Sequence, residues 1–180
     1  MYRNRITKLL LVICCCMLGN AKYGHAQGFS EVAQANGIDA SYGTNTNFGG
    51  GVSAYDFDGD GWDDLTFATD SLDSILIYRN TGQGFERMRP QGIGEVKETK
   101  QVVWADFDND GDADLFASGN RTASYLYVND GNFNFNKMEF PKHDSVPVSE
   151  IPSFGAAFTD LDRDGYLDLF VTHYKGNLPV

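Results

Sequence analysis

Cysteine, histidine and basic residues are scarce in this sequence of 180 residues. The three cysteines are Cys14, Cys15 and Cys16, so the rest of the chain has no means of forming a disulfide bond. Against 14 Lys and Arg stand 25 Asp and Glu, and the net charge of −11 excludes nucleic acid as a partner. The histidines stand apart from any cysteine or serine motif, so they offer neither a zinc site nor a catalytic pair.

Long apolar runs and helical periodicity are lacking as well. The apolar stretch from Leu9 to Leu18 is too short to span a membrane. Helical repeats would need long segments with a 3.6-residue period, and only Glu31 to Asn36 has the pattern of a helical turn. With 42% hydrophobic residues, the chain still has enough apolar material for one substantial core. An all-β fold is therefore expected.

The first 26 residues predict a secretory signal peptide. Three basic residues precede the apolar stretch, and a polar segment that ends at Ala26 follows it. Cleavage after Gly24-His25-Ala26 fits a small-residue site and leaves Gln27 as the new N-terminus, and an uncleaved anchor is the alternative. We expect a secreted protein, extracellular or at the cell surface, with no membrane span once the leader is removed.

A repeat of about fifty residues organises the rest of the chain. Its clearest part is the nine-residue motif D-x-D-x-D-G-x-x-D, which begins at Asp56, Asp106 and Asp160. A short apolar strand precedes each motif and another follows it, and turn residues come after a third strand. From residue 27 onward, the repeat units span about 48–98, 99–150 and 151–180, the last of them truncated.

Each complete unit contains four predicted strands, which is the composition of one β-propeller blade. We expect a propeller of four-stranded antiparallel blades, here an incomplete ring of about two and a half blades. The remainder of the ring would belong to the same parent chain. The expected strands are 51–55, 65–68, 76–78 and 85–88, then 101–105, 115–117, 126–128 and 135–138, and finally 155–159 and 169–172.

The three motifs hold 14 of the 25 acidic residues, at positions that suit a hard cation. Ca²⁺ takes about six to eight oxygens, so a chain that wraps around it needs alternate carboxylates plus one backbone carbonyl. Gly at position 6 permits the sharp turn, and position 7 would offer the carbonyl. About one Ca²⁺ per loop is expected, with these ligands: Asp56, Asp58, Asp60, Trp62 and Asp64; Asp106, Asp108, Asp110, Asp112 and Asp114; Asp160, Asp162, Asp164, Tyr166 and Asp168.

Hydrophobic residues flank the carboxylates in every copy of the motif. Position 2 holds Phe57, Phe107 and Leu161, and position 10 holds Leu65, Leu115 and Leu169. We expect these side chains to point away from the ion and to anchor both ends of each loop in the sheet.

Three alternatives to a calcium loop suit the motif less well. Mg²⁺ demands strict octahedral geometry and keeps its waters, and Zn²⁺ prefers His or Cys. An EF-hand needs flanking helices and a Glu at position 12, where this chain has Phe67, Ala117 and Val171 in predicted strands. Solvated Asp-Gly turns without any ion are the third alternative, and three copies in register argue against them.

Several segments resemble those of a known family. They are the motif DFDGDGWDDL at 56–65 with its two counterparts, and the segments YRNTG at 78–82 and YVNDG at 127–131. With Phe154-Gly155, they make residues 28–180 similar to the FG-GAP or VCBS repeats of integrin-α-type propellers, including secreted proteins with a downstream ASPIC/UnbV domain. Lys100-Gln101 departs from the glycine-containing pairs of other repeats. The resemblance implies that the loop joins the first two strands of a blade and binds calcium, within a ring of about seven blades.

Two classes of function stay open. One is a non-catalytic binding or adhesion module with an extracellular protein or carbohydrate as ligand. The other is the calcium-stabilised propeller of a secreted enzyme such as a polysaccharide lyase. A glycosidase acid needs a raised pKa, whereas a bound cation favours the ionised carboxylate, and the remaining acids form no catalytic set. We favour the binding module, in which Trp62 and Tyr166 would stack on a ligand or pack on a neighbouring loop.

Overall fold

The computed structural model describes residues 28–42, 49–70, 74–94, 98–120, 122–139 and 152–173. The predicted signal peptide lies outside these residues. The chain divides into a unit of residues 1–31 and a unit of residues 32–180, and all the strands described below belong to the second unit. No helix within the described segments combines the length and the apolarity of a membrane-spanning one.

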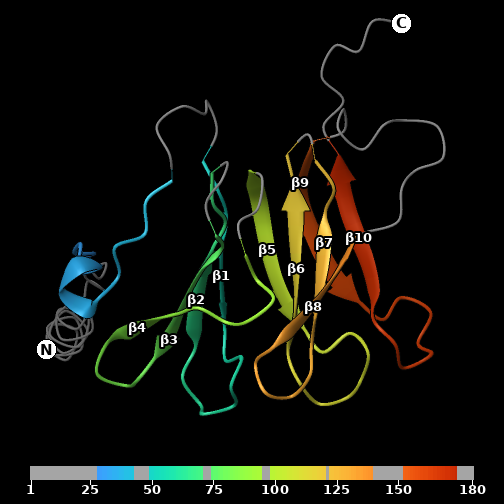
Figure 1. Cartoon of the computed structure of the whole chain (residues 1–180), viewed down its shortest axis with the longest axis horizontal. Helices are drawn as coiled ribbons and strands as arrows, with labels where there is room; N and C mark the ends of the chain where they lie inside the picture. The colour runs from blue at the N-terminus through green and yellow to red at the C-terminus, as the bar shows by residue number, and fades with distance from the viewer. Residues whose placement is uncertain are drawn as a thin grey trace, which may run out of the picture. The chain divides into compact units, whose positions relative to one another are not determined.

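Three antiparallel sheets follow one another along the chain, and their colours run from teal through yellow to red in Figure 1. In each sheet the strands are hydrogen-bonded in sequence order or as a pair, so the predicted all-β fold with four-stranded antiparallel blades is confirmed. The strands are β1 (Val52–Tyr55), β2 (Asp64–Phe67), β3 (Leu76–Asn80) and β4 (Phe85–Met88); β5 (Thr99–Ala105), β6 (Asp114–Gly119), β7 (Tyr125–Asn129) and β8 (Phe135–Glu139); and β9 (Ser153–Thr159) and β10 (Asp168–His173).

The second strand of each sheet begins one residue earlier than predicted, on the last aspartate of the motif. In the ladders, Tyr55 pairs with Asp64, Ala105 with Asp114 and Thr159 with Asp168. An aspartate is an unfavourable strand residue, which is why the sequence pattern places it in the loop. Its position in the strand fixes the carboxylate relative to the sheet.

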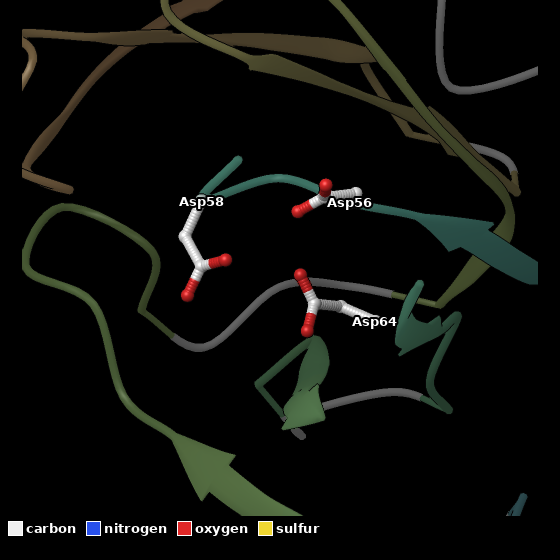
Figure 2. A group of neighbouring side chains, drawn as sticks. All are labelled: Asp56, Asp58 and Asp64. Atoms are coloured by element: carbon white, nitrogen blue, oxygen red, sulfur yellow. The ribbon is translucent and has the colours of Figure 1, made fainter. Parts of the chain in front are cut away.

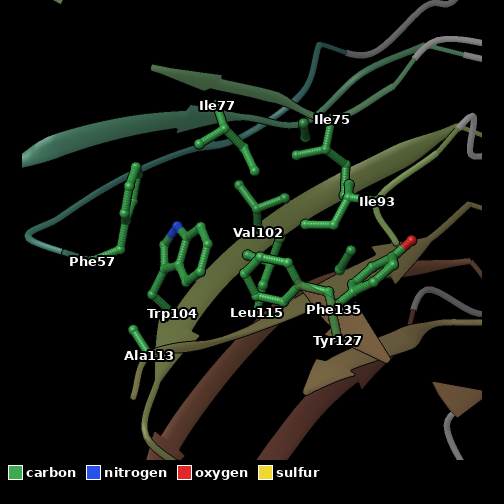
Figure 3. Close-up of a cluster of buried hydrophobic side chains, with 12 residues drawn as sticks. Phe57, Ile75, Ile77, Ile93, Val102, Trp104, Ala113, Leu115, Tyr127 and Phe135 are labelled. Carbon is green, nitrogen blue, oxygen red and sulfur yellow. The ribbon is translucent and has the colours of Figure 1, made fainter. Parts of the chain in front are cut away.

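A hydrophobic core lies between the first two sheets, and Figure 3 shows Ile77 of the first facing Val102 and Trp104 of the second. Ile77 and Val102 are fully buried, and the indole nitrogen of Trp104 donates a 2.9 Å hydrogen bond to the hydroxyl of Thr66. The backbone N–H of Thr99 donates to the carbonyl of Thr69 at 2.9 Å. The sheets are therefore held together by apolar packing and by buried hydrogen bonds.

An aromatic pair recurs at each junction between sheets. Phe57, at position 2 of the first loop, lies 5.0 Å from Trp104, and Phe107, at position 2 of the second, stacks on Phe158 at 6.3 Å. The residue at position 2 of the third loop, Leu161, is 68% exposed. The expectation that this residue anchors its loop is wrong for Leu161, because the described residues contain no following sheet to cover it.

The structure explains why Lys100 stands where other repeats of the family have a glycine-containing pair. The Lys100 side chain is buried, forms an ion pair with Glu98 and donates a 2.9 Å hydrogen bond to the hydroxyl of Tyr42. Tyr42 in turn donates to the backbone carbonyl of Thr99 at 3.0 Å. Burial raises the pKa of Glu98, but the hydrogen bonds from Lys100 and Asn120 outweigh it and leave the pKa lowered. This network ties the segment before the first sheet to the start of β5.

The N-terminal segment forms little regular structure. A short 3-10 helix, η1 (Gln34–Asn36), falls within the stretch for which a helical turn is predicted. Gly37 ends it with a positive φ of 87° and approaches the carbonyl of Phe85 so closely that a Cβ would lie 2.5 Å away. Only glycine fits there.

Tyr78 and Tyr127 occupy the same place in the first two sheets, because each pairs with the leucine that follows its loop. Both are fully buried. The hydroxyl of Tyr78 donates to Asp39 at 2.5 Å, whereas that of Tyr127 has no hydrogen-bond partner among the described residues. The two tyrosines therefore differ in whether the buried hydroxyl is hydrogen-bonded, and this difference affects the free energy of folding.

The difference traces to one residue of the repeat. Gly92 lies against the carbonyl of Phe135 as Gly37 lies against that of Phe85, so the two glycines are equivalent. Two residues further along, the first repeat has Asp39 and the second has Gly94. A carboxylate in one repeat is thus replaced by a bare Cα in the other.

We predict opposite effects for the same substitution at the two tyrosines. Tyr78→Phe removes a satisfied hydrogen bond and should lower the free energy of unfolding by about 1–2 kcal/mol. Tyr127→Phe removes a buried hydroxyl without a partner in the described part of the chain, so the free energy of unfolding should stay constant or rise by up to about 1 kcal/mol. Urea denaturation of the two variants beside the wild type measures both values, and equal losses would contradict the assignment.

Candidate metal centre

The three loops bring carboxylates together in the same way. In each loop the side chains of positions 1, 3 and 9 converge, with ligand oxygens that lie within 4.8 Å of one another. Figure 2 shows the first group, in which the three carboxylates face a common point. The triads are Asp56, Asp58 and Asp64; Asp106, Asp108 and Asp114; and Asp160, Asp162 and Asp168.

The first aspartate of each motif organises its loop. One of its oxygens accepts the N–H of position 5 and the other accepts the N–H of the glycine at position 6, over distances of 2.8–3.2 Å in all three copies. The first aspartate thus closes the turn from position 1 to position 6 through hydrogen bonds within the loop itself.

The aspartate at position 5 lies outside the triads. In every loop one of its oxygens accepts the N–H of position 7, at 2.9 Å for Asp60, 3.0 Å for Asp110 and 2.8 Å for Asp164. The ligand roles predicted for these three carboxylates, and for the carbonyls of Trp62, Asp112 and Tyr166, stay predictions. The Trp62 ring lies against the turn at Gly82, where a Cβ would come within 3.3 Å of it.

Two positions in each loop adopt the left-handed backbone conformation. Position 6 has φ values of 91° at Gly61, 95° at Gly111 and 93° at Gly165, so the predicted need for glycine is confirmed. Position 4 is also left-handed, and its φ is 72°, 60° and 63° in the three loops. The residues at position 4 are Gly59, Asn109 and Arg163, and the motif letters alone do not indicate that they share this conformation.

The aspartate at position 9 joins the loop to its sheet. Asp64 and Asp114 are each 1% exposed. One oxygen of Asp64 accepts the N–H of Phe57 at 3.0 Å, and the other accepts the N–H of Asn80, at the end of β3, at 2.7 Å. Asp114 repeats this with Asn129 at 2.8 Å. The loop, the second strand and the third strand therefore meet at one carboxylate.

Asn80 and Asn129 are site residues that the sequence reasoning missed. Their side-chain amides donate to the backbone carbonyls of Asp63 and Ala113, at 3.1 and 3.2 Å. These hydrogen bonds fix the end of each loop to the end of the third strand. The signal is present in the sequence, because the segments YRNTG and YVNDG share an asparagine at this place. Local propensity accounts for that asparagine as a turn residue and says nothing of the loop that it contacts.

The charges explain why a cation fits these loops. Burial, reinforced by Asp108 and Asp110, raises the pKa of Asp114 to about 6 even though two backbone N–H groups oppose the shift. Burial raises the pKa of Asp64 as well. A divalent cation would restore the ionised form, and the triads supply only oxygen ligands, which suit Ca²⁺ better than Zn²⁺, since Zn²⁺ prefers His and Cys.

Comparison with known proteins agrees with this geometry. The FG-GAP-like repeat matches residues 56–117 and 106–171. Each match begins at the first aspartate of one loop and ends in the strand that follows the next loop, β6 or β10. Cartilage acidic protein 1 of Xenopus tropicalis is 28% identical over 153 residues, which cover 81% of this chain and 23% of that protein. The chain spans about a quarter of the length of this relative. Because the repeat covers more than half of the sequence and contains the carboxylate triads, the chain belongs to the FG-GAP-like repeat family.

Proposed function

We propose that this chain is a calcium-binding β-propeller module of a secreted protein, with a non-catalytic role in binding or adhesion. The observation that carries the calcium assignment is the recurrence of one carboxylate triad in three loops, in each of which the first aspartate accepts the same two backbone N–H groups. When bound, the ion would neutralise the mutual repulsion of these carboxylates and stiffen the loop. The positions 1, 3 and 9 of each motif would hold it.

Several features support a binding role over catalysis. The carboxylates of the triads accept backbone N–H groups, which favours their ionised form, and a bound cation would favour it further. A general acid has to carry a proton, so these carboxylates are poorly suited to that role. Ser153 lies 3.1 Å from a ring nitrogen of His173, but the two are cross-strand neighbours and the serine is only 4% exposed. This pair therefore serves the β9–β10 ladder.

The surface around the loops supports an extracellular protein or a carbohydrate as the partner. Trp62 is 55% exposed and Tyr166 is 61% exposed, each at position 7 of its loop. Exposed aromatic rings of this kind stack on sugars or on protein side chains. The frog relative is named as an acidic protein of cartilage, and this chain shares the acidic excess. Secretion follows from the predicted signal peptide.

Calorimetric titration of the full chain with CaCl₂ should show about three sites, with dissociation constants of about 10⁻⁴–10⁻³ M, as in other extracellular modules. Calcium should also raise the melting temperature, because binding to the folded form alone adds stability. The absence of calcium heat, or a tenfold preference for zinc, would contradict the proposal.

Asp108→Asn should remove one of the three calcium sites, because it takes a charged ligand from a triad and keeps the shape of the side chain. Asp112→Asn is the matched control, since its side chain lies outside the triad of the same loop. We expect the calcium-dependent gain in melting temperature to shrink only in the first variant. An equal loss in both would mean that net charge, not a defined site, controls stability.

The binding role is tested on arrays of matrix proteins and oligosaccharides, with calcium and with chelator. We expect calcium-dependent retention on at least one of them, weakened by Trp62→Ala or Tyr166→Ala, and no cleavage of the bound polysaccharide. Release of shortened sugar chains would favour the enzyme alternative and overturn the non-catalytic assignment.

A further inference from the structure

The second and third loops are connected by a side chain at position 4. The amide nitrogen of Asn109 donates a 2.8 Å hydrogen bond to the backbone carbonyl of Gly165 in the third loop. The carbonyl oxygen only accepts, so the bond defines which end of the Asn109 amide faces it. Asn109 lies between two aspartates of its own motif, and Gly165 follows Asp164 in the other.

Gly165 is itself part of the cation loop. Its N–H donates to Asp160, the first ligand of the third triad, at 3.1 Å. One residue therefore receives the Asn109 amide on its carbonyl and holds a triad carboxylate with its N–H. Any restriction of the second loop at Asn109 passes directly to the third loop at Gly165.

The first and second loops have no such connection among the residues that the structure describes. Position 4 of the first loop is Gly59, which carries no side chain, and a Cβ built there would meet nothing within 4 Å. A cleft of about 530 Å³ is lined by residues of both loops, among them Asp58, Gly59 and Asp112. Both junctions have an aromatic pair, Phe57 with Trp104 and Phe107 with Phe158, but a hydrogen bond from the side chain at position 4 to the next loop is described only at the second junction.

We infer that calcium binding to the second loop and to the third loop is cooperative through Asn109, whereas the first loop binds calcium independently. This inference rests on the calcium role proposed above. A cation held by Asp108 restricts the backbone at Asn109, the bridge restricts Gly165, and the third loop then loses less conformational freedom when it binds its own ion. By linkage, the third loop helps the second by the same factor.

One solvent-exposed hydrogen bond corresponds to about a two- to tenfold change in an equilibrium constant. That factor is the expected size of the coupling. It is small against the affinity of each site, so all loops should still bind calcium without the bridge.

The test is a calcium titration of the full chain followed by NMR, with the amide signals of Gly61, Gly111 and Gly165 as separate reporters of the three loops. In the wild-type background, Asp108→Asn should raise the calcium midpoint at Gly165 by about two- to tenfold. Asp58→Asn, the same change in the first loop, should leave the midpoint at Gly165 unchanged.

Asn109→Gly removes the bridge and keeps a residue that favours positive φ, as Gly59 does in the first loop. In this background, Asp108→Asn should no longer shift the midpoint at Gly165. Arg163→Gly makes the same backbone change at position 4 of the third loop and should preserve the coupling.

The coupling would be overturned if Asp108→Asn left the calcium midpoint at Gly165 unchanged in the wild-type background. It would also be overturned if Asp108→Asn still shifted this midpoint in the Asn109→Gly background. If no reporter responds to calcium, the calcium assignment fails as well. The two failures are therefore distinguishable.

Discussion

A single buried carboxylate at the start of the second strand holds each complete sheet together with its loop. Asp64 and Asp114 are almost without solvent contact, and a buried charge is costly unless hydrogen bonds and an opposite charge compensate it. Each accepts one N–H from the beginning of the loop and another from the end of the third strand. The loop, the second strand and the third strand are therefore positioned by one group, and a cation at the proposed calcium site would compensate the carboxylate charge further.

Under the proposed function, this constraint would make the cation part of the fold. The described strands are four to seven residues long, and no cysteine lies beyond residue 16 to stabilise them covalently. With more than half of the acidic residues in three loops, the carboxylates of an ion-free chain repel one another in each loop between the first and second strands of a sheet. Free energy gained on cation binding would then be free energy of folding, as it is in small domains that a metal stabilises.

Features set by neighbours in the chain were predictable from the sequence, and features set by distant partners were not. The spacing of the motif placed the strands and required glycine at Gly61, because both depend on local geometry. The role of Asn80 depends on a carboxylate 16 residues away, and the exposure of Leu161 depends on a sheet absent from the described residues. Tyr127 and Tyr78 occupy equivalent places in the repeat, and only the structure shows that the Tyr127 hydroxyl has no hydrogen-bond partner among the described residues.

Position 4 of the loop shows how a local requirement creates a long-range contact. Its backbone is left-handed in all three copies, a conformation in which glycine and asparagine are least strained. Gly59 meets the requirement and leaves a cleft, while Asn109 meets it and adds an amide that reaches the next loop. Arg163 adopts the same conformation, at a cost of about 1 kcal/mol for a residue with an ordinary Cβ, and no bridge to another loop accompanies it in the described residues. In the coupling inferred above, communication between the proposed cation sites would depend on Asn109, a residue outside the triads, so the three copies of one motif are not equivalent.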